Sequence, residues 1–285
     1  VTTPMGNCFT FQSMEIIEKK GRLVSSQAGV DQGFIVIVNI SQDEYFYQMY
    51  SYSAGIRILV HDPRDWPLID SLGMAISPGT ETFLSVSETR VKRMPPPYGN
   101  NTCIDVTDPN FRNPLKYFDE YTKSACIENC LVDFLISSCQ CIPHTTIIKN
   151  SSVPICSFAS YNDCVRKMEY LYKTSNEYLM KCNCRDPCTK TSYQVTRSEA
   201  YFPSERRTEE LSAIYGYPDD FSAFMRQNYL VLTMYISEMN YNVYEESAAY
   251  SIGDFQSDVG GNLGLCLGAS FLSLAELIEY FIFVI

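Results

Sequence analysis

The stretch CNCRDPC, residues 182–188, holds three of the chain's 12 cysteines and decides how the surrounding elements are joined. Cys182 and Cys184 are two positions apart, so on an extended strand they share one face, about 6.6 Å apart. Cys126 and Cys130 are four positions apart, so on a helix they share one face with a rise of about 6 Å. Because the two rises match, a helix antiparallel to this strand could be joined to it twice. The pairs would be Cys126–Cys184 and Cys130–Cys182.

The other cysteines extend this framework. Cys103 follows a proline-rich stretch and could close on Cys188 as a third rung. Four more cysteines would staple the intervening loop, but spacing leaves their pairing open, since even eight cysteines allow 105 pairings. These are Cys139, Cys141, Cys156 and Cys164. Cys8 has no partner in this sequence, which predicts that its partner precedes residue 1, and Cys266 is expected to be a reduced, packed thiol.

Zinc is the alternative use of the closely spaced cysteines in 139–141 and 182–188. Structural zinc sites usually use pairs spaced C-x2–4-C and often histidine, and this chain has only 2 histidines, His61 and His144. Three Asn-x-Ser/Thr sequons accompany the cysteines, and together they favour an oxidising, extracytoplasmic compartment and therefore disulfides. The predicted glycosylation sites are Asn39, Asn100 and Asn150.

The charge of the chain limits its partners. It has 33 acidic and 22 basic residues, a formal net charge of -11, so nucleic acid, whose phosphates would be repelled, is not an expected partner. An acidic surface instead gathers cations. The sequence contains no G-x-S-x-G and no H-E-x-x-H motif, and its histidines offer little material for acid–base catalysis, so it is not expected to be an enzyme.

Hydrophobic patterning predicts an α+β fold. Residues 8–95 are rich in β-branched and aromatic residues, which favours strands. The expected strands are 34–40, 55–62 and 81–94, with a longer strand or strand pair over 229–251. The expected helices, where apolar positions recur at three and four, are 113–138, 161–181, 204–215 and 218–228. A stiff hinge at 94–101 ends the first sheet region.

The last residues look like a membrane span that carries acids. Residues 260–285 are long enough to cross a bilayer, which needs about 20 apolar residues, yet they include Glu276 and Glu279. A carboxylate facing lipid is costly, so the segment is either a single-pass anchor with its acids near the headgroups or a pore-lining helix. Ser270, Ser273 and the two acids are spaced by three, so on an unbroken helix they sweep about half a turn and cannot all face one lumen.

Two arrangements of this segment satisfy that geometry. Either only some of the four residues face a lumen, or the helix breaks near Gly268-Ala269-Ser270, where small residues permit a break. A break would free backbone carbonyls to line a narrow ring, as irregular backbone does where it borders a water-filled path.

Four stretches of the chain resemble segments of one channel superfamily. GNCFTF at 6–11 resembles its early ectodomain motif, and 55–103 follows its palm and β-ball segment almost position by position. The cysteines from Cys103 to Cys188 are similar to its disulfide-stapled thumb, and SDVGGNLGLCLGASFLSLAELIEY at 257–280 is similar to its second transmembrane helix. On these stretches the chain resembles the degenerin/epithelial sodium channel superfamily. The GLCLGAS motif is most similar to the FMRFamide-type neuropeptide-gated sodium channels.

The resemblance implies a disulfide-rich extracellular α+β domain, with a β-sheet palm, a β-ball and a helical thumb, followed by a transmembrane pore helix. The implied segments are palm, β-ball and finger at 1–102, thumb at 103–188, palm return and knuckle-like helices at 189–256, and the second transmembrane helix at 257–285. The first transmembrane helix would precede this sequence, and Cys8 would pair with a cysteine there. The resemblance also adds the pairs Cys139–Cys164 and Cys141–Cys156.

The same resemblance implies a subunit of a trimeric, ligand-gated, sodium-selective channel of the plasma membrane that amiloride-type compounds block. It implies no cofactor besides permeant Na⁺, and its partners would be two further copies of itself, the lipid bilayer and an extracellular peptide. The implied selectivity filter is Gly268, Ala269 and Ser270, with acidic rings at Glu276 and Glu279. The implied gate is Ser257, Asp258 and Gly261.

The trigger is indicated by charges between the implied finger and thumb. Acid-sensing members of the superfamily carry acidic pairs there, and close carboxylates with raised pKa values are a physical means of sensing protons. This chain places Arg64 between Asp62 and Asp65, and its matching thumb segment 165–167 is basic. These charges weigh against proton sensing, and the resemblance of the GLCLGAS motif implies an extracellular neuropeptide as the trigger. The alternatives are an acid-gated, mechanically gated or constitutive channel of the superfamily, and a single-pass cysteine-rich receptor without a pore.

Overall fold

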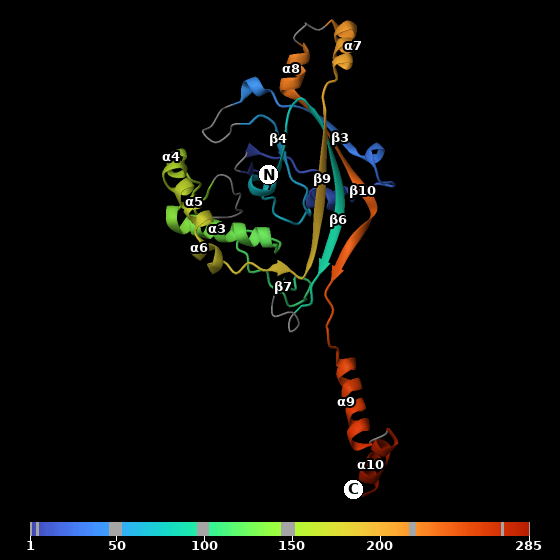
Figure 1. Ribbon diagram of the computed structural model, residues 1–285. Coiled ribbons are helices and arrows are strands. Elements are labelled where there is room, and N and C mark those ends of the chain that lie inside the picture. The colour runs from blue at the N-terminus through green and yellow to red at the C-terminus, as the bar shows by residue number, and fades with distance from the viewer. Residues whose placement is uncertain are drawn as a thin grey trace.

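The computed structural model describes residues 2–3, 6–45, 53–95, 103–143, 152–216, 221–268 and 271–284. The strands are β1 (Thr2–Thr3), β2 (Gly6–Asn7), β3 (Phe34–Asn39), β4 (Ile56–Ile58), β5 (Met74–Ile76), β6 (Thr80–Lys92), β7 (Cys103–Ile104), β8 (Asp186–Pro187), β9 (Thr189–Tyr201) and β10 (Tyr229–Glu245). The helices are α1 (Met14–Lys20), α2 (Ile69–Leu72), α3 (Lys123–Cys139), α4 (Phe158–Ser160), α5 (Arg166–Thr174), α6 (Asn176–Lys181), α7 (Glu205–Tyr215), α8 (Phe221–Asn228), α9 (Ile252–Leu267) and α10 (Phe271–Val284), with short helical turns η1 (Val30–Gln32), η2 (Gln42–Glu44) and η4 (Tyr161–Val165). Long strands and a separate group of helices give an α+β fold (Figure 1).

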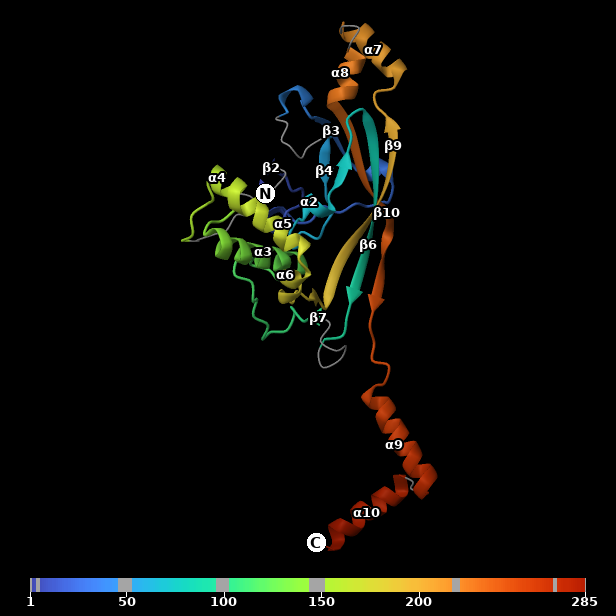
Figure 2. The same cartoon turned by 60° about the vertical axis from the view of Figure 1, so that its left-hand side comes forward.

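The centre of the molecule is a four-stranded sheet in the order β3-β10-β6-β9. β6 pairs with β9 in antiparallel fashion along all 13 of its residues, and it pairs with β10 in parallel. Leu84 of β6 and Leu230 of β10 are fully buried and pack with Ile76 of β5, so one face of the sheet carries a hydrophobic core. The second half of β10 is exposed, and this strand leads out of the sheet toward α9 (Figure 2).

The helices α3 to α6 lie beside the sheet and form what we call the helical domain (Figure 1). This domain has its own core, in which Leu135, Val165 and Tyr172 are buried together. The Phe134 ring packs on Tyr172 and Tyr178 with centroids 5.3 and 4.7 Å away. Burying a large apolar side chain contributes about 1.5–3 kcal/mol, so hydrophobic contacts stabilise this domain in addition to its disulfides.

The first helix of this domain begins later than the sequence predicts. The apolar pattern predicts a helix over 113–138, whereas α3 begins at Lys123. The Thr122 hydroxyl accepts a hydrogen bond from the Ala125 amide and caps the helix at this point. The residues before it form a loop held by the Asn113 side chain, which donates to two backbone carbonyls of that loop. The loop therefore satisfies its backbone without helical hydrogen bonds.

Other boundaries also differ from the predicted ones. The helix predicted over 161–181 divides into η4 with α5, and then α6, because Ser175 adopts an extended backbone with φ -98° and ψ 114°. The strand expected over 55–62 is only β4, and the strand expected over 229–251 ends at Glu245. The remaining predicted strands and helices agree with β3, β6, α7 and α8 to within about three residues at each end. The predicted hinge at 94–101 lies outside the described residues from position 96 onward.

Five disulfides join described cysteines. They are Cys103–Cys188, Cys126–Cys184, Cys130–Cys182, Cys139–Cys164 and Cys141–Cys156. Their Cα–Cα distances of 4.9 to 6.2 Å are normal for disulfides, and the pairs are those that the spacing and the family resemblance indicate. Cys266 is a free thiol, but it is exposed in the single chain, so the expectation that it is packed was wrong for this chain alone.

Candidate functional site

Hydrogen bonds fix the junction between the sheet and the C-terminal segment. Ser251 caps α9: its hydroxyl accepts from the Asp254 amide at 3.1 Å, and the Asp254 carboxylate accepts from the Ser251 amide at 2.7 Å. The Tyr250 phenol donates to the Asp258 carboxylate at 2.6 Å. These contacts set the direction in which α9 leaves the end of β10.

The predicted gate residues lie on one side of α9. Ser257 and Gly261 are four positions apart and share a helix face, and Asp258 lies beside them. All three are exposed, and apart from Gly264 so is every α9 residue whose burial the structure describes. Several of the exposed α9 side chains are large and apolar. Exposed apolar surface of this extent marks a site of interaction with other protein or with a membrane.

The C-terminal segment is interrupted at the predicted small residues. α9 ends at Leu267, and Gly268 adopts a left-handed backbone with φ 63° before α10 begins at Phe271. A Cβ at Gly268 would meet no atom within 4 Å, so glycine is favoured there by its backbone conformation and not by space. Of the two arrangements that the spacing allowed, the structure has the broken helix. The other two predicted filter residues, Ala269 and Ser270, lie outside the described residues.

The predicted acidic rings lie on α10, after the break. Glu276 and Glu279 are both exposed and, being three positions apart, point about 60° apart around the helix. Neither carboxylate forms an ion pair with another described residue. α9 has 16 residues and α10 has 14, and in the described part of the chain no helix has both the length and the apolar character needed to cross a membrane. The transmembrane assignment of 257–285 therefore stays a prediction.

A charged cluster joins the helical domain to the sheet near this junction. The Asp186 carboxylate lies 3.1 Å from the ammonium of Lys123, 3.3 Å from that of Lys190 and 3.6 Å from the guanidinium of Arg93. Burial opposes the ionisation of Asp186, but hydrogen bonds and charge from Lys123 and Lys190 bring its pKa below the usual range. The cluster thus connects the start of α3, the end of β6 and the start of β9.

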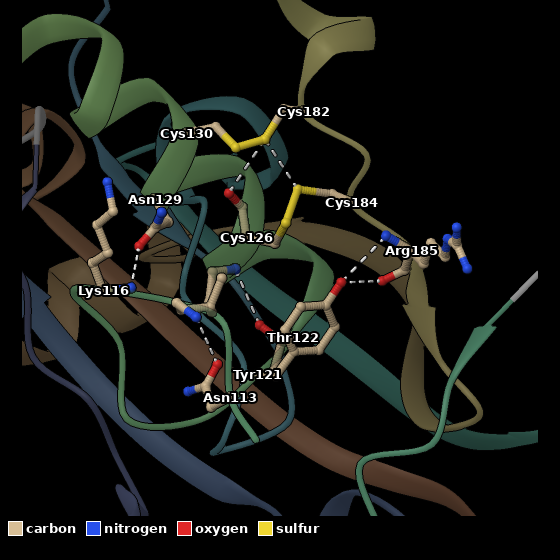
Figure 3. The surroundings of a disulfide bond; sticks show 12 residues. Asn113, Lys116, Tyr121, Thr122, Cys126, Asn129, Cys130, Cys182, Cys184 and Arg185 are labelled. Carbon is tan, nitrogen blue, oxygen red and sulfur yellow. Dashed lines mark hydrogen bonds between the residues drawn. A yellow bond between two sulfur atoms is a disulfide. The ribbon is translucent and has the colours of Figure 1, made fainter. Parts of the chain in front are cut away.

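Two disulfides join α3 to the segment that precedes β8 (Figure 3). Cys126 and Cys130 project from one face of α3 toward Cys184 and Cys182, so the two bonds are stacked side by side. Tyr121 fixes the facing segment, because its phenol donates to the Arg185 carbonyl at 2.9 Å and accepts from the Arg185 amide at 3.2 Å. The helical domain is therefore attached to the segment that enters β8 by covalent and hydrogen bonds together.

A cavity of about 460 Å³ lies where the helical domain meets the loop of residues 62–65. Asp62 and Arg64 form an ion pair in its wall, with the Arg64 Nε 3.1 Å from the carboxylate. Burial alone would raise the pKa of Asp62, but its hydrogen bonds with Arg64 lower it. One carboxylate oxygen of Asp65 is buried and has no hydrogen-bond partner among the described residues. These three residues line the cavity together with the loop that precedes α3 and the first residues of that helix, whereas the segment 165–167 does not line it.

An ion pair between the helical domain and α2 is not predictable from the sequence pattern. Lys173 of α5 lies 3.4 Å from the Asp70 carboxylate of α2 and 2.8 Å from Glu169 of its own helix. The pair Glu169–Lys173 is visible in sequence as a helical i,i+4 pair, but its contact with Asp70, which is 103 positions away, is not.

The predicted glycosylation sites are placed only in part. Asn39 is exposed at the end of β3, where its side chain donates to the Tyr229 hydroxyl at 3.3 Å. Asn100 and Asn150 lie outside the described residues. Glycosylation of the three asparagines stays a prediction, and so does the pairing of Cys8, whose expected partner is not part of this sequence.

The main features of the chain are thus a disulfide-stapled helical domain on a long sheet and an interrupted C-terminal segment, and comparison with known proteins gives its family. The family model described as amiloride-sensitive sodium channel matches residues 1–280, so the chain belongs to this family. The family consists of ion channels, so the chain is not an enzyme.

Individual relatives within this family are acid-sensing channels. Over 98% of its length the chain is 31% identical to acid-sensing ion channel 1 of Gallus gallus and 30% identical to acid-sensing ion channel 1A of Danio rerio. It is 27% identical to acid-sensing ion channel 2 of Homo sapiens, also over 98% of its length. It covers 51%, 53% and 52% of these proteins, so the chain spans about half the length of the curated relatives it matches.

Proposed function

We propose that this chain forms most of the extracellular domain and the pore-lining segment of one subunit of a trimeric, sodium-selective channel in the plasma membrane, blocked by amiloride-type compounds. The observation that carries the proposal is the C-terminal segment: a capped helix attached to β10, a break at Gly268, and a second helix with acids. Membership of the amiloride-sensitive sodium channel family supports it.

The roles within this pore follow from chemistry. Three copies of α9 would cover one another's apolar faces, with Ser257, Asp258 and Gly261 at their closest approach. The backbone at Gly268–Ser270 would offer a ring of oxygens to a partly dehydrated cation, which is how narrow filters discriminate among ions. Glu276 and Glu279 would raise the local concentration of cations below this ring.

The proposed trigger is an extracellular peptide. Two carboxylates that face the helical domain, Asp62 and Asp70, are each paired with a cation, Arg64 and Lys173. The pKa of Asp62 is lowered, so its charge persists in mildly acidic solution and is lost only below the usual range of an aspartate. A contact built this way does not supply the close acid pairs with raised pKa values that proton sensing needs.

Acid gating is the second candidate. The acid-sensing relatives favour it, and so does Asp65, whose buried carboxylate oxygen has no hydrogen-bond donor among the described residues. The intact channel expressed in oocytes separates the two, with current recorded during pH steps and then during application of amidated peptides. Peptide-evoked, amiloride-blocked sodium current without an acid response would support peptide gating. An acid response without a peptide response would refute it, and the absence of any current under every stimulus would count against the pore itself.

A further inference from the structure

The cavity of about 460 Å³ beside the loop 62–65 has the size of a small-molecule site. Four separate parts of the chain form its wall: that loop, the loop after β7, the start of α3 with the residues before it, and the start of β9. Two aromatic rings belong to this wall, Phe111 and Tyr121, which meet edge to face with their centroids 6.1 Å apart. The cavity thus combines an apolar surface with charged groups from several elements.

On one part of its wall, this cavity has more carboxylates than cations. Asp62 and Glu120 share the guanidinium of Arg64, whose pKa is raised first by its hydrogen bond with Asp62 and also by the charge of Glu120. Asp65 forms no ion pair within the described ranges, and its Oδ1 atom is buried there without a hydrogen-bond donor. Asp119 adds a further carboxylate to the lining. A buried carboxylate oxygen without a donor is unfavourable, so a positive group in the cavity would stabilise this part of the wall.

On another part of the wall, cations outnumber carboxylates. Lys123 and Lys190 line the cavity, and both pair with the carboxylate of Asp186, at 3.1 and 3.3 Å. The same carboxylate also lies 3.6 Å from Arg93, so one negative charge faces three positive charges. The side chains of Lys123 and Lys190 are 44% and 39% exposed, so both stay accessible to a ligand. An anionic group in the cavity would offset this excess of positive charge.

We propose that this cavity binds a zwitterionic α-amino acid with an apolar side chain. Its ammonium group lies at the carboxylates of Asp65 and Glu120, and its carboxylate lies at the ammonium groups of Lys123 and Lys190. Its side chain packs against the aromatic part of the wall. A simple cation or a simple anion would compensate only one of the two excess charges, whereas a zwitterion compensates both. This site is separate from the proposed peptide trigger and does not depend on it.

Three related probes test the proposal on the full-length protein in lipid nanodiscs, with binding followed by saturation-transfer NMR titrations. L-Phenylalanine carries both charges, N-acetyl-L-phenylalanine lacks the ammonium, and L-phenylalaninamide lacks the carboxylate. We expect L-phenylalanine to bind at saturable sites, and each derivative to bind about tenfold more weakly, because each loses one set of charge-assisted hydrogen bonds. Equal affinity for the three probes, or no binding of L-phenylalanine, would overturn the proposal.

Substitutions assign each charge of the ligand to one part of the wall. Glu120→Gln should weaken the binding of L-phenylalanine and of the amide about fivefold and leave the N-acetyl derivative unchanged, since that derivative has no ammonium. Lys190→Gln should weaken L-phenylalanine and the N-acetyl derivative and leave the amide unchanged. The matched controls Glu177→Gln and Lys181→Gln, on exposed α6 outside the cavity, should bind like the wild type. A variant that only disturbs the fold would weaken all three probes alike, and this result would refute the assignment.

Hydrogen exchange locates the ligand without reference to ion conduction. A saturating concentration of L-phenylalanine should slow amide exchange in the two segments 119–124 and 189–191, which meet at the cavity. The same concentration of L-phenylalaninamide should slow it less. Exchange in the segment 205–215 of α7, which does not line the cavity, should stay the same. Protection confined to other parts of the molecule, or no protection at saturation, would show that the ligand does not occupy this cavity.

Discussion

Tyr250 links the end of the sheet to the first turns of α9 through a single hydrogen bond to Asp258. Tyr250→Phe removes only the phenolic oxygen and leaves the Asp258 carboxylate without this donor. Because Asp258 is a proposed gate residue, we expect the variant to change the midpoint of ligand activation and the closing rate while the surface expression stays the same. Both are measured in current recordings from the intact channel.

Tyr244→Phe is the matched control for this prediction. Tyr244 is also exposed and lies near the end of β10, but its hydroxyl forms no hydrogen bond with another described residue. The control should gate like the wild type. Identical gating in the Tyr250→Phe channel would show that the hydrogen bond does not position the gate residue.

Asp186 carries most of the charge compensation between the helical domain and the sheet. Asp186→Asn leaves three cations without their carboxylate, so the free energy of unfolding at neutral pH should fall by about 1–3 kcal/mol. The pKa of Asp186 is lowered in the folded protein, so its stabilising effect is present above the ordinary value of 3.8 and is lost as the pH falls further. The difference in melting temperature between variant and wild type should therefore be largest near neutrality and vanish in strong acid. A difference that does not depend on pH would contradict this account.

Single residues explain which disulfides were predictable from the sequence. Cys126 and Cys130 repeat with the helical period and lie on α3, as predicted. Cys182 and Cys184 were expected on a strand, but the structure has no strand at residues 182–185, so the pairs agree with the prediction although the strand rule does not hold there. Gly268 was a candidate break for a similar local reason, since only glycine adopts its left-handed backbone without cost. The contact between Lys173 and Asp70 obeys no local rule, and it appears only when the tertiary structure is known.

Among the elements, α5 and α2 make a second ion-paired contact between the helical domain and the sheet side, besides the cluster around Asp186. Burial opposes the charge of Lys173, but Glu169 and Asp70 raise its pKa, so the ammonium of Lys173 stays charged through neutral and into basic solution. Lys173→Glu would place three carboxylates together and raise at least one of their pKa values. Such a contact is stable below the unfolded pKa and weakens as the pH rises through the raised value. We expect the melting temperature of this variant to increase between about pH 7 and pH 5 relative to the wild type.

Lys181→Glu controls for the added charge. Lys181 forms the same kind of helical pair with Glu177, but both side chains are exposed, and within the described ranges no ion pair joins them to another element. This variant should show the pH dependence of the wild type. If both variants behaved alike, the effect would come from net charge and not from the contact between α5 and α2.

Sequence periodicity does not predict where the helices begin and end. The apolar residues of 113–121 continue the period of α3, but Thr122 caps the helix and Asn113 holds the preceding loop, so the helix begins at Lys123. Periodicity reports which side chains are buried, and a loop that packs against other elements can satisfy the same pattern. In the sequence, the capping threonine and the asparagine that holds the loop are weaker indicators of where the helix begins than the run of apolar residues.

At the level of the whole molecule, one chain leaves its C-terminal segment uncovered. α9 and α10 lie apart from the sheet and the helical domain (Figures 1 and 2), and nearly all of their described residues are exposed. The sequence shows that this segment is apolar and predicts its break near Gly268, but the burial of its apolar faces depends on an assembly that one chain does not form. The proposed trimer supplies that burial and at the same time surrounds an ion path, which a single-pass receptor would not contain.

Ion selectivity and unit conductance distinguish a trimeric pore from a single-pass receptor. In a pore, enlarging the filter ring with Ser270→Cys should change the reversal potential in mixed Na⁺ and K⁺, because ring size sets the discrimination between partly dehydrated cations. Glu276→Gln and Glu279→Gln each remove one negative charge per subunit, so the unit conductance should fall, and the loss should be larger at low ionic strength if the ring is solvated. Glu177→Gln, a neutralisation on exposed α6, is the matched control and should leave both quantities unchanged. If all three pore variants, at matched surface expression, kept the wild-type reversal potential and unit conductance, neither the filter nor the acidic rings would lie where we place them, because a charge that borders an ion path must alter the current through it.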